Sequence, residues 1–448
     1  MAAKYRNRRA GARTRFPGIW VLLFTVLYLL LPGFNGFGGI SAFKTHLYYG
    51  LTGLLGIGML IALLRQRSRG GLRRDRLPRL SGLGIAALCY LFFTLLSAAL
   101  SPYQPDAWYS EKCHEAAVTI VCYLLMFGIL AGTESWNETA KVALLGALSA
   151  FCLICVIQLL GGNPFGLYPN GLTYADGYGR KYSGAFLGTM GNVDLVSVFL
   201  CTVIPLTVVL AWRDRRLRWW AAGVGAACLA VLLWIRVLCG IVGLLMGLVL
   251  SAVVVVPWRK NHRRIYVGLL AAAAVCGVLL LRFWDPPVNF LHELHEILNG
   301  RISDRFGTGR VFIWRQLLER IPDRLFFGTG PDTVRLTGLA PFQRFDASGK
   351  LVSQAMLTDA HCFPLQILYC QGLPALLSWL VMVGFAVRTW WRTRTDPVCA
   401  ALGASLVCWI CAMLFGFCSV ILQPWFWLLL GLLVSRARSL RGETSGSK

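Results

Sequence analysis

The sequence contains few charged residues, and the acidic ones are the scarcest. Asp, Glu, Lys and Arg together make up 14% of the 448 residues, whereas an average soluble domain has about 25%. Hydrophobic residues make up 56%, and a water-soluble fold could not bury that much apolar surface. The composition therefore excludes a soluble enzyme, a disordered chain and a disulfide-rich secreted scaffold. The mean hydropathy of +0.61 instead indicates many membrane spans.

Motifs for nucleotide, metal and redox chemistry are also absent. The sequence has no Walker-type phosphate loop, and the predicted outer loops have no DxD pair. His292 and His295 lie near two glutamates, but their spacing differs from that of the HExxH zinc motif. Cys152 and Cys155 have CxxC spacing inside an apolar run, where we interpret them as packing residues. We therefore expect neither a metal nor a cofactor.

Apolar runs of about 17 to 25 residues recur along the chain, which is the length that an α-helix needs to cross a bilayer. We expect twelve such helices, in an all-α polytopic membrane protein. The stretch 219–257 is too long for one helix, so we divide it at Arg236, and Gly416 is the expected turn before the last helix. The predicted spans lie near 17–33, 47–64, 80–100, 116–132, 141–160, 185–211, 219–235, 237–257, 265–283, 362–387, 397–415 and 417–434.

Basic residues are distributed unevenly between the two sides of this predicted bundle. Twelve spans put both termini on one side, and 29 of the 44 Lys and Arg residues fall on that side. The positive-inside rule then predicts that both termini are cytoplasmic. We interpret the net charge of +24 as topology and contact with anionic lipids rather than nucleic-acid binding. The short loops of the opposite side hold five cations, namely Lys44, Lys112, Arg180, Lys181 and Arg236.

Five parts are expected along the chain. They are a basic cytoplasmic N-terminus at 1–16, helices at 17–283, one large extracytoplasmic loop at 284–361, helices at 362–434 and a cytoplasmic tail at 435–448. The large loop is too small for an enzyme domain with its own extensive core. We therefore expect the loop to act together with the ends of the helices.

Within the large loop, residues 309–321 follow helical spacing. Trp314, Leu317 and Ile321 fall on one face, with charged residues elsewhere, and a proline follows the segment. This pattern predicts an amphipathic helix on the outer membrane surface. Residues 346–350 are rich in turn formers and predict the tip of a hairpin.

Several polar residues at the outer ends of the spans call for an explanation. Arg236 stands among apolar residues, where an arginine costs several kcal/mol unless it is paired or hydrated. It either extends to the interface or binds an anion, and both readings stay open. Asp359 and His361 lie where the tenth span begins; a lone histidine is more often structural, but the neighbouring cationic loop favours a function. Together with Arg180 and Lys181, these residues suggest a site for a lipid-linked phosphate or diphosphate.

A glycine-rich polar stretch stands at the outer end of the sixth span. Residues 187–194 combine two glycines with threonine, asparagine and aspartate. Irregular backbone is tolerated at membrane depth only where it faces protein or a water-filled cavity. The stretch therefore either lines a site or forms a tight crossing between helices.

Four of these segments, in this order along the chain, resemble the motifs of one family. The sequence resembles the O-antigen ligase and polymerase superfamily of bacterial membrane proteins. The matching pieces are Gly188-Thr189-Met190-Gly191-Asn192, Arg236 with Gly240 and Gly243, Gly309-Arg310 with Trp314 and 327–331, and Asp359-Ala360-His361 with Leu365-Gln366. The chain departs from the family's usual residues at Cys362, Asp194 and Ile235.

The resemblance implies a metal-independent membrane glycosyltransferase with a GT-C-like bundle, acting at the outer face of the bacterial plasma (inner) membrane. The donor would be a glycan on undecaprenyl diphosphate, and the acceptor a hydroxyl on a glycan, a lipid or a protein. His361 would activate the acceptor as a base or only orient it, and Arg236 and Arg310 would bind the diphosphate. Direct displacement would invert the anomeric centre. The supporting residues expected are Arg180, Lys181, Asn192, Trp314, Asp359 and Gln366.

Three other functions remain open from the sequence. A surface-polysaccharide polymerase of the same superfamily would use the same motifs and differ in its acceptor. A lipid-linked glycan flippase or another transporter would instead need charges at mid-bilayer and internal repeats, and we find no clear repeat. A cell-wall glycosyltransferase of the shape-and-division type would use a carboxylate of the large loop, such as Asp304 or Asp332.

Overall fold

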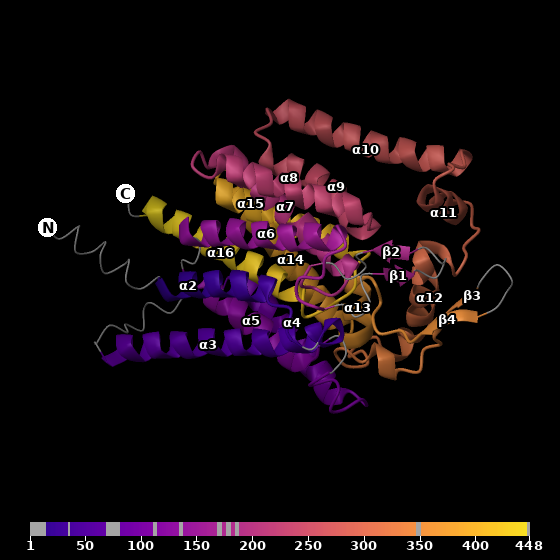
Figure 1. Ribbon diagram of the computed structural model, residues 1–448, viewed down its shortest axis with the longest axis horizontal. Coiled ribbons are helices and arrows are strands. Elements are labelled where there is room, and N and C mark those ends of the chain that lie inside the picture. Colours follow the sequence, from indigo (N-terminus) through magenta and orange to yellow (C-terminus); the bar gives the residue numbers. More distant parts are fainter. Residues whose placement is uncertain are drawn as a thin grey trace.

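The computed structural model shows a bundle of long helices with a smaller cap of short helices and hairpins at one end (Figure 1). It describes residues 15–34, 36–68, 81–110, 114–133, 138–167, 173–175, 181–183, 188–345 and 351–445. The α-helices are α2 (Arg15–Leu23), α3 (Ile40–Ser68), α4 (Gly82–Leu100), α5 (Ala117–Ala131), α6 (Glu138–Leu159), α7 (Val193–Arg213), α8 (Arg218–Ile235), α9 (Leu238–Val255), α10 (Lys260–Phe283), α11 (Asn289–Leu298), α12 (Arg310–Arg320), α13 (Phe363–Gln371), α14 (Leu373–Thr393), α15 (Pro397–Met413) and α16 (Gln423–Ser445). The strands are β1 (Thr173–Ala175), β2 (Lys181–Ser183), β3 (Phe342–Phe345) and β4 (Leu351–Ala355).

Eight helices of the described chain are long and apolar enough to cross a membrane. They are α3, α4, α6, α7, α8, α9, α10 and α14. Shorter apolar helices lie at Phe16–Tyr28, Ala117–Ala131 and Pro397–Met413. The expected architecture is therefore confirmed as mostly helical with several candidate membrane spans, while the count of twelve spans stays a prediction.

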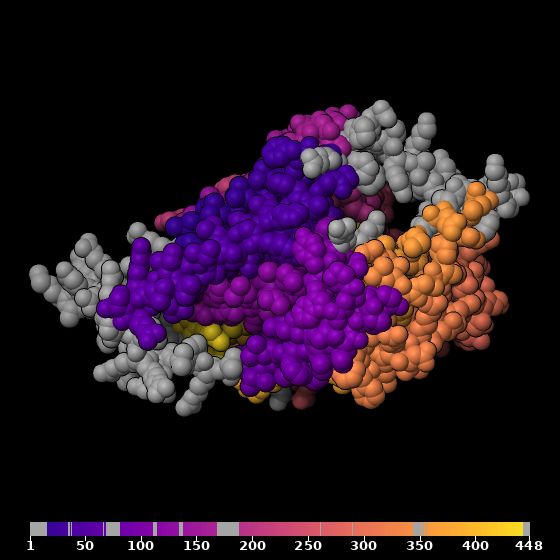
Figure 2. Space-filling model, turned by 90° about the horizontal axis from the view of Figure 1, so that it is seen from below, coloured from indigo at the N-terminus to yellow at the C-terminus, as the bar shows by residue number. Residues whose placement is uncertain are grey.

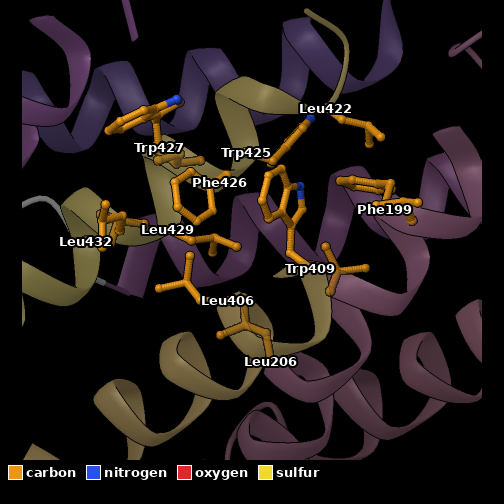
Figure 3. Packing of buried hydrophobic residues seen from close by; sticks show 14 of the residues in the cluster. Phe199, Leu206, Leu406, Trp409, Leu422, Trp425, Phe426, Trp427, Leu429 and Leu432 are labelled. Atoms are coloured by element: carbon orange, nitrogen blue, oxygen red, sulfur yellow. The ribbon is translucent and has the colours of Figure 1, made fainter. Parts of the chain in front are cut away.

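The core of the bundle is built around α7, α15 and α16. In Figure 3 the ring of Trp409 packs on Phe426, with 4.5 Å between centroids, and Trp425 packs on Phe199 at 4.9 Å. Helix α9 reaches this core through glycines, because a Cβ atom on Gly243 would lie 2.5 Å from Ala412 of α15. Small residues that let backbones approach are a common way to join helices within a membrane. The resulting frame holds the ends of α7, α9 and α15 close together.

The break predicted at Arg236 is confirmed. Helix α8 ends at Ile235, Arg236 adopts a left-handed conformation with φ of +55°, and α9 begins at Leu238. A left-handed residue reverses the chain at a helix end, so two helices form from one continuous apolar stretch.

Two other predicted boundaries are wrong. The predicted span 362–387 is divided into α13 and α14 at Gly372, which has φ of +87° and lies so close to Phe326 that a Cβ atom would come 2.1 Å from its carbonyl oxygen. The sixth span begins at Val193 rather than at 185, because the Asn192 side chain caps α7. The turn predicted at Gly416 is confirmed, and it extends over 414–422 between α15 and α16.

Lys44 is buried within α3 and is not the exposed loop cation that the sequence predicts. Its side chain is 1% exposed, and its ammonium group donates hydrogen bonds to the carbonyl oxygens of Tyr28 and Leu29. The Leu29 carbonyl also accepts a hydrogen bond from the Thr189 hydroxyl. Since Thr189 and Met190 are buried as well, the glycine-rich stretch forms a tight crossing of helices at these residues.

Residues 284–361 form the cap, which lies at the end of the bundle away from the beginning of α2 and the end of α16 (Figure 1). Figure 2 shows the orange part of the chain gathered at this end. The predicted hairpin is confirmed as the antiparallel pair β3 and β4, and the residues of its tip lie outside the described ones. Helix α12 matches the predicted amphipathic helix, but Leu317 and Ile321 pack on Tyr369 of α13. This face is therefore covered by protein rather than by the membrane surface.

Candidate functional site

Arg310 anchors the cap to the turn between α15 and α16. The residue opens α12, and Gly309 before it has φ of +93°, a position where a Cβ atom would lie 2.4 Å from the Phe342 ring. The guanidinium Nε and Nη2 atoms donate to the Phe415 carbonyl oxygen at 3.2 and 2.9 Å. Its Nη1 atom donates to the Gly307 carbonyl and the Thr308 hydroxyl, each at 2.8 Å. These four bonds leave one of the five guanidinium N–H groups for a ligand.

His361 lies next to Arg310 with an uncommitted ring nitrogen. The imidazole meets the Phe417 ring edge-on at 5.7 Å, and its buried Nδ1 atom has no hydrogen-bond partner in the described part of the chain. Burial and, to a smaller extent, the positive charge of Arg310 together lower the pKa of His361 from 6.5 to about 4. The imidazole is therefore neutral near pH 7, with a buried polar atom that no described residue satisfies.

The peptide segment before His361 is held by buried side chains. Asp359 accepts hydrogen bonds from the backbone N–H groups of His361, at 2.6 Å, and Cys418, at 2.9 Å. Trp314 donates from its indole to the Ala360 carbonyl at 2.9 Å, and Gln366 accepts from the Ala360 N–H at 2.8 Å. These predicted supporting residues, Trp314, Asp359 and Gln366, thus fix the backbone that carries the histidine, from α12, the loop and α13.

The Asp359 carboxyl is unusually hard to ionise. Burial raises its pKa from 3.8 to about 7; the N–H donors of Cys418 and His361 oppose the rise, and the nearby Asp332 adds to it. Between pH 3.8 and about pH 7, the Asp359 carboxyl keeps its proton in the folded protein but releases it in the unfolded chain. The folded state therefore loses stability as the pH rises from about 4 to about 7.

Replacing Asp359 by alanine is expected to destabilise the protein by about 1 to 3 kcal/mol, because two buried N–H groups lose their acceptor. Thermal unfolding in detergent measures this change. The loss of wild-type stability between pH 4 and pH 7 should also become smaller in the variant. Asp359→Asn keeps one acceptor oxygen, so its stability should lie between that of the wild type and that of Asp359→Ala. Unchanged stability in Asp359→Ala would contradict the role given to this carboxylate.

The beginnings of α7 and α9 lie in the same neighbourhood. Asn192, a predicted supporting residue, accepts a hydrogen bond from the Asp194 N–H at 2.7 Å and so caps α7. The positive charge of Arg310 interacts electrostatically with the side chains of Asp194 and Cys239. The Ser197 hydroxyl joins the two helices, donating to the Asp194 carbonyl at 2.8 Å and lying 3.3 Å from the Cys239 sulfur. The sequence singled out Asp194 only as a departure from the family pattern.

The remaining predicted cations are not joined to His361 by any contact. Arg236 is exposed, three residues before Cys239, and makes no hydrogen bond or ion pair with any residue that the structure describes. Lys181 belongs to β2, but its side chain lies outside the described atoms. Arg180 lies outside the described residues altogether. The structure thus places Arg310 within electrostatic range of His361, while Arg236 is exposed and has no hydrogen-bond or ion-pair partner among the described residues.

A buried acidic pocket adjoins the segment that carries His361. Its lining includes Glu115, Asp332, Gln366 and Cys418. Asp332 accepts from the Glu115 N–H at 3.1 Å, and the Tyr123 hydroxyl donates to the Glu115 carboxylate at 2.6 Å. Burial raises the pKa of Glu115 well above its usual value, against the bond from Tyr123. No sequence signal pointed to Glu115, which precedes α5, far from the cap in sequence.

The two large-loop carboxylates of the cell-wall alternative are engaged within the protein. Asp304 forms an ion pair with Arg315 at 2.9 Å, and Asp332 faces Glu115 as described. In the described part of the chain, no three His, Cys, Asp or Glu residues are placed to hold a metal ion.

A protein-family model described as O-antigen ligase matches residues 236–380. The match begins at Arg236 and contains Arg310, Trp314, Asp359 and His361. Residues 236–380 are thus similar to the O-antigen ligase family, which supports the resemblance found in the sequence. A search of curated proteins finds no match. The O-antigen ligase match ends within α14, so the turn at 414–422 that receives Arg310 lies outside it.

Proposed function

We propose that this protein transfers a glycan from undecaprenyl diphosphate to an acceptor hydroxyl, in the manner of an O-antigen ligase. The observation that carries the proposal is the neutral His361 imidazole, with its unbonded Nδ1 atom, beside the Arg310 guanidinium. The reaction needs no metal and inverts the anomeric centre. It takes place at the cap, on the outer face of the bacterial inner membrane, and both chain termini are cytoplasmic.

The arginines act on the leaving group. Cleaving a sugar from a lipid diphosphate builds negative charge on the departing oxygen, and a positive group near that oxygen stabilises the charge as it grows. Arg310 offers its remaining N–H and its charge, and Arg236 offers an exposed guanidinium without a protein partner. Arginine suits this task because its planar fork of donors matches a phosphate.

His361 acts on the acceptor. The acceptor hydroxyl loses a proton while it attacks the sugar, and a neutral histidine takes up such a proton with a typical gain of about 10² to 10⁴ in rate. A bound diphosphate brings negative charge next to the imidazole and offsets the effect of Arg310. The pKa of His361 therefore rises when the donor binds, toward the range where a general base works best.

The pH dependence of transfer tests this coupling. For kcat/KM, which reports the free enzyme, the acidic fall should be centred near pH 4, far below the 6.5 of an ordinary histidine. For kcat, which reports the enzyme with bound donor, the acidic fall should lie at a higher pH, because the diphosphate is then present. Initial rates between about pH 3 and pH 8 in a detergent assay measure both. Coinciding acidic falls would contradict a base that responds to the bound diphosphate.

The activity itself is tested with purified protein, an undecaprenyl-diphosphate glycan and EDTA, with and without candidate acceptors. Transfer to a distinct acceptor supports the ligase reaction. Growth of the lipid-linked glycan without a second kind of acceptor identifies a polymerase instead. Movement of the donor across a vesicle membrane without transfer would replace both by a flippase.

A further inference from the structure

Two arginines lie against one tryptophan at the end of the bundle far from His361. Helix α14 starts beside α13 and runs for 21 residues, about 30 Å, so Trp391 lies near its opposite end. The guanidinium of Arg263, from α10, lies 4.9 Å from the Trp391 ring centroid. The guanidinium of Arg394, just after α14, lies 4.8 Å from the same centroid. Two positive groups from separate helices therefore share one aromatic ring.

These two arginines have no carboxylate to balance their charge. None of the ion pairs between described residues includes Arg263 or Arg394. The carboxylate of Asp396 is already bound to Arg436 at 2.8 Å and to the Cys399 N–H at 3.0 Å. The Nε atom of Arg263 is buried and has no hydrogen-bond partner among the described residues. Two like charges with an unused donor between protein and membrane form a site for an anion.

An apolar pocket lies along the same half of α14, lined by Trp390, the neighbour of Trp391 in sequence. Val387 and Val383 lie four and eight residues before Trp391, hence on the same face of the helix. Both line this shallow apolar pocket, together with Val407 and Ile410 of α15. Val387 is 41% exposed, so the pocket is accessible from the apolar surface of the bundle.

We propose that this place binds an anionic phospholipid. The lipid phosphate lies between Arg263 and Arg394, and one acyl chain follows α14 over the exposed Val387 and the shallow apolar pocket beside it. A net negative headgroup is favoured over a zwitterionic one, because the amine of the latter would be brought near two guanidinium groups. The site is independent of the glycan reaction, which occurs at the opposite end of α14.

The bound lipid would fasten α10 to the rest of the bundle. The most apolar window of α10 has none of its residues buried in the protein. Few polar contacts hold this helix to α9, among them the bond from the Tyr266 hydroxyl to the Val249 carbonyl at 3.1 Å. A phosphate shared by Arg263 of α10 and Arg394 beyond α14 adds a bridge that the protein itself does not supply.

Lipid binding by the purified full-length protein tests the proposal. We expect native mass spectrometry to show bound phosphatidylglycerol, and thermal unfolding to shift upward with phosphatidylglycerol but not with phosphatidylcholine or inorganic phosphate. In the double variant Arg263→Gln/Arg394→Gln, the apparent Kd for phosphatidylglycerol should rise by about tenfold or more. The matched control, Arg65→Gln/Arg67→Gln, removes two exposed arginines from the last turn of α3 and should keep wild-type binding.

A second variant keeps both arginines and closes the pocket. Val387→Trp places a bulky side chain where the acyl chain would lie, and it should lower phosphatidylglycerol binding without changing the charge. The proposal is overturned if the double arginine variant binds phosphatidylglycerol as the wild type does, or if phosphatidylcholine gives the same shift. An equal shift with inorganic phosphate would show an anion site without a lipid.

Discussion

The His361→Ala variant should transfer glycan about 10² to 10⁴ times more slowly than the wild type, with donor binding nearly unchanged. The imidazole is the group whose buried Nδ1 atom has no partner among the described residues, and nothing in the variant takes over its proton. Initial rates in the EDTA assay measure the loss, and thermal unfolding measures whether the fold persists.

The backbone at His361 sets the design of its controls. The residue has φ of +49°, a left-handed conformation that asparagine tolerates better than most side chains do. His361→Asn therefore keeps the turn and a hydrogen-bonding amide but cannot act as a base. A rate close to wild type in this variant would show that His361 only orients the acceptor. His46→Ala changes an exposed histidine on α3 and should leave the rate unchanged.

The Arg310→Gln variant is expected to lose about 10² to 10³ in rate, the usual effect of removing a donor that stabilises developing negative charge. Arg310→Lys keeps the charge but not the fork of donors that reaches the Phe415 carbonyl, so it should recover only part of the rate. Steady-state kinetics with varied donor separate the two contributions. Arg315→Gln, on the exposed side of the same helix, is the matched control and should transfer normally.

A second measurement links Arg310 to the histidine. The positive charge of Arg310 lowers the pKa of His361, so Arg310→Gln should move the acidic fall of kcat/KM to a higher pH. Arg310→Lys retains the charge and should move it less. An acidic fall that stays in place in Arg310→Gln would contradict the electrostatic contact between these residues.

Much of the fold could be predicted because hydropathy and turn chemistry act locally. The break at Arg236 follows from an apolar stretch too long for one span, and α12 follows from helical spacing between Gly309 and Pro322. The division at Gly372 has a local signal too, since Gly372 has φ of +87° and Pro374 stands in the first turn of α14, but the close approach of the Phe326 carbonyl is a contact between distant segments.

The candidate site could be predicted in its residue types but not in its assembly. Arginine and histidine at the ends of apolar runs are visible in any sequence, and Arg310 and His361 do lie together. Which carbonyl accepts from Arg310 depends on the turn after α15, where the sequence shows only apolar residues around Phe415. Glu115 was missed for the same reason, since its partner Asp332 is 217 residues away.

The turn at 414–422 has a consequence for biosynthesis. Its Phe415 carbonyl accepts a hydrogen bond from Arg310, and its Cys418 N–H donates one to Asp359. The turn nevertheless lies near the end of the chain. While the ribosome is still completing α15, the cap has already been translated but lacks these partners. The centre can therefore assemble only after the last pair of helices has been inserted. A premature stop after residue 400 should leave every family motif in place and yield no working catalyst.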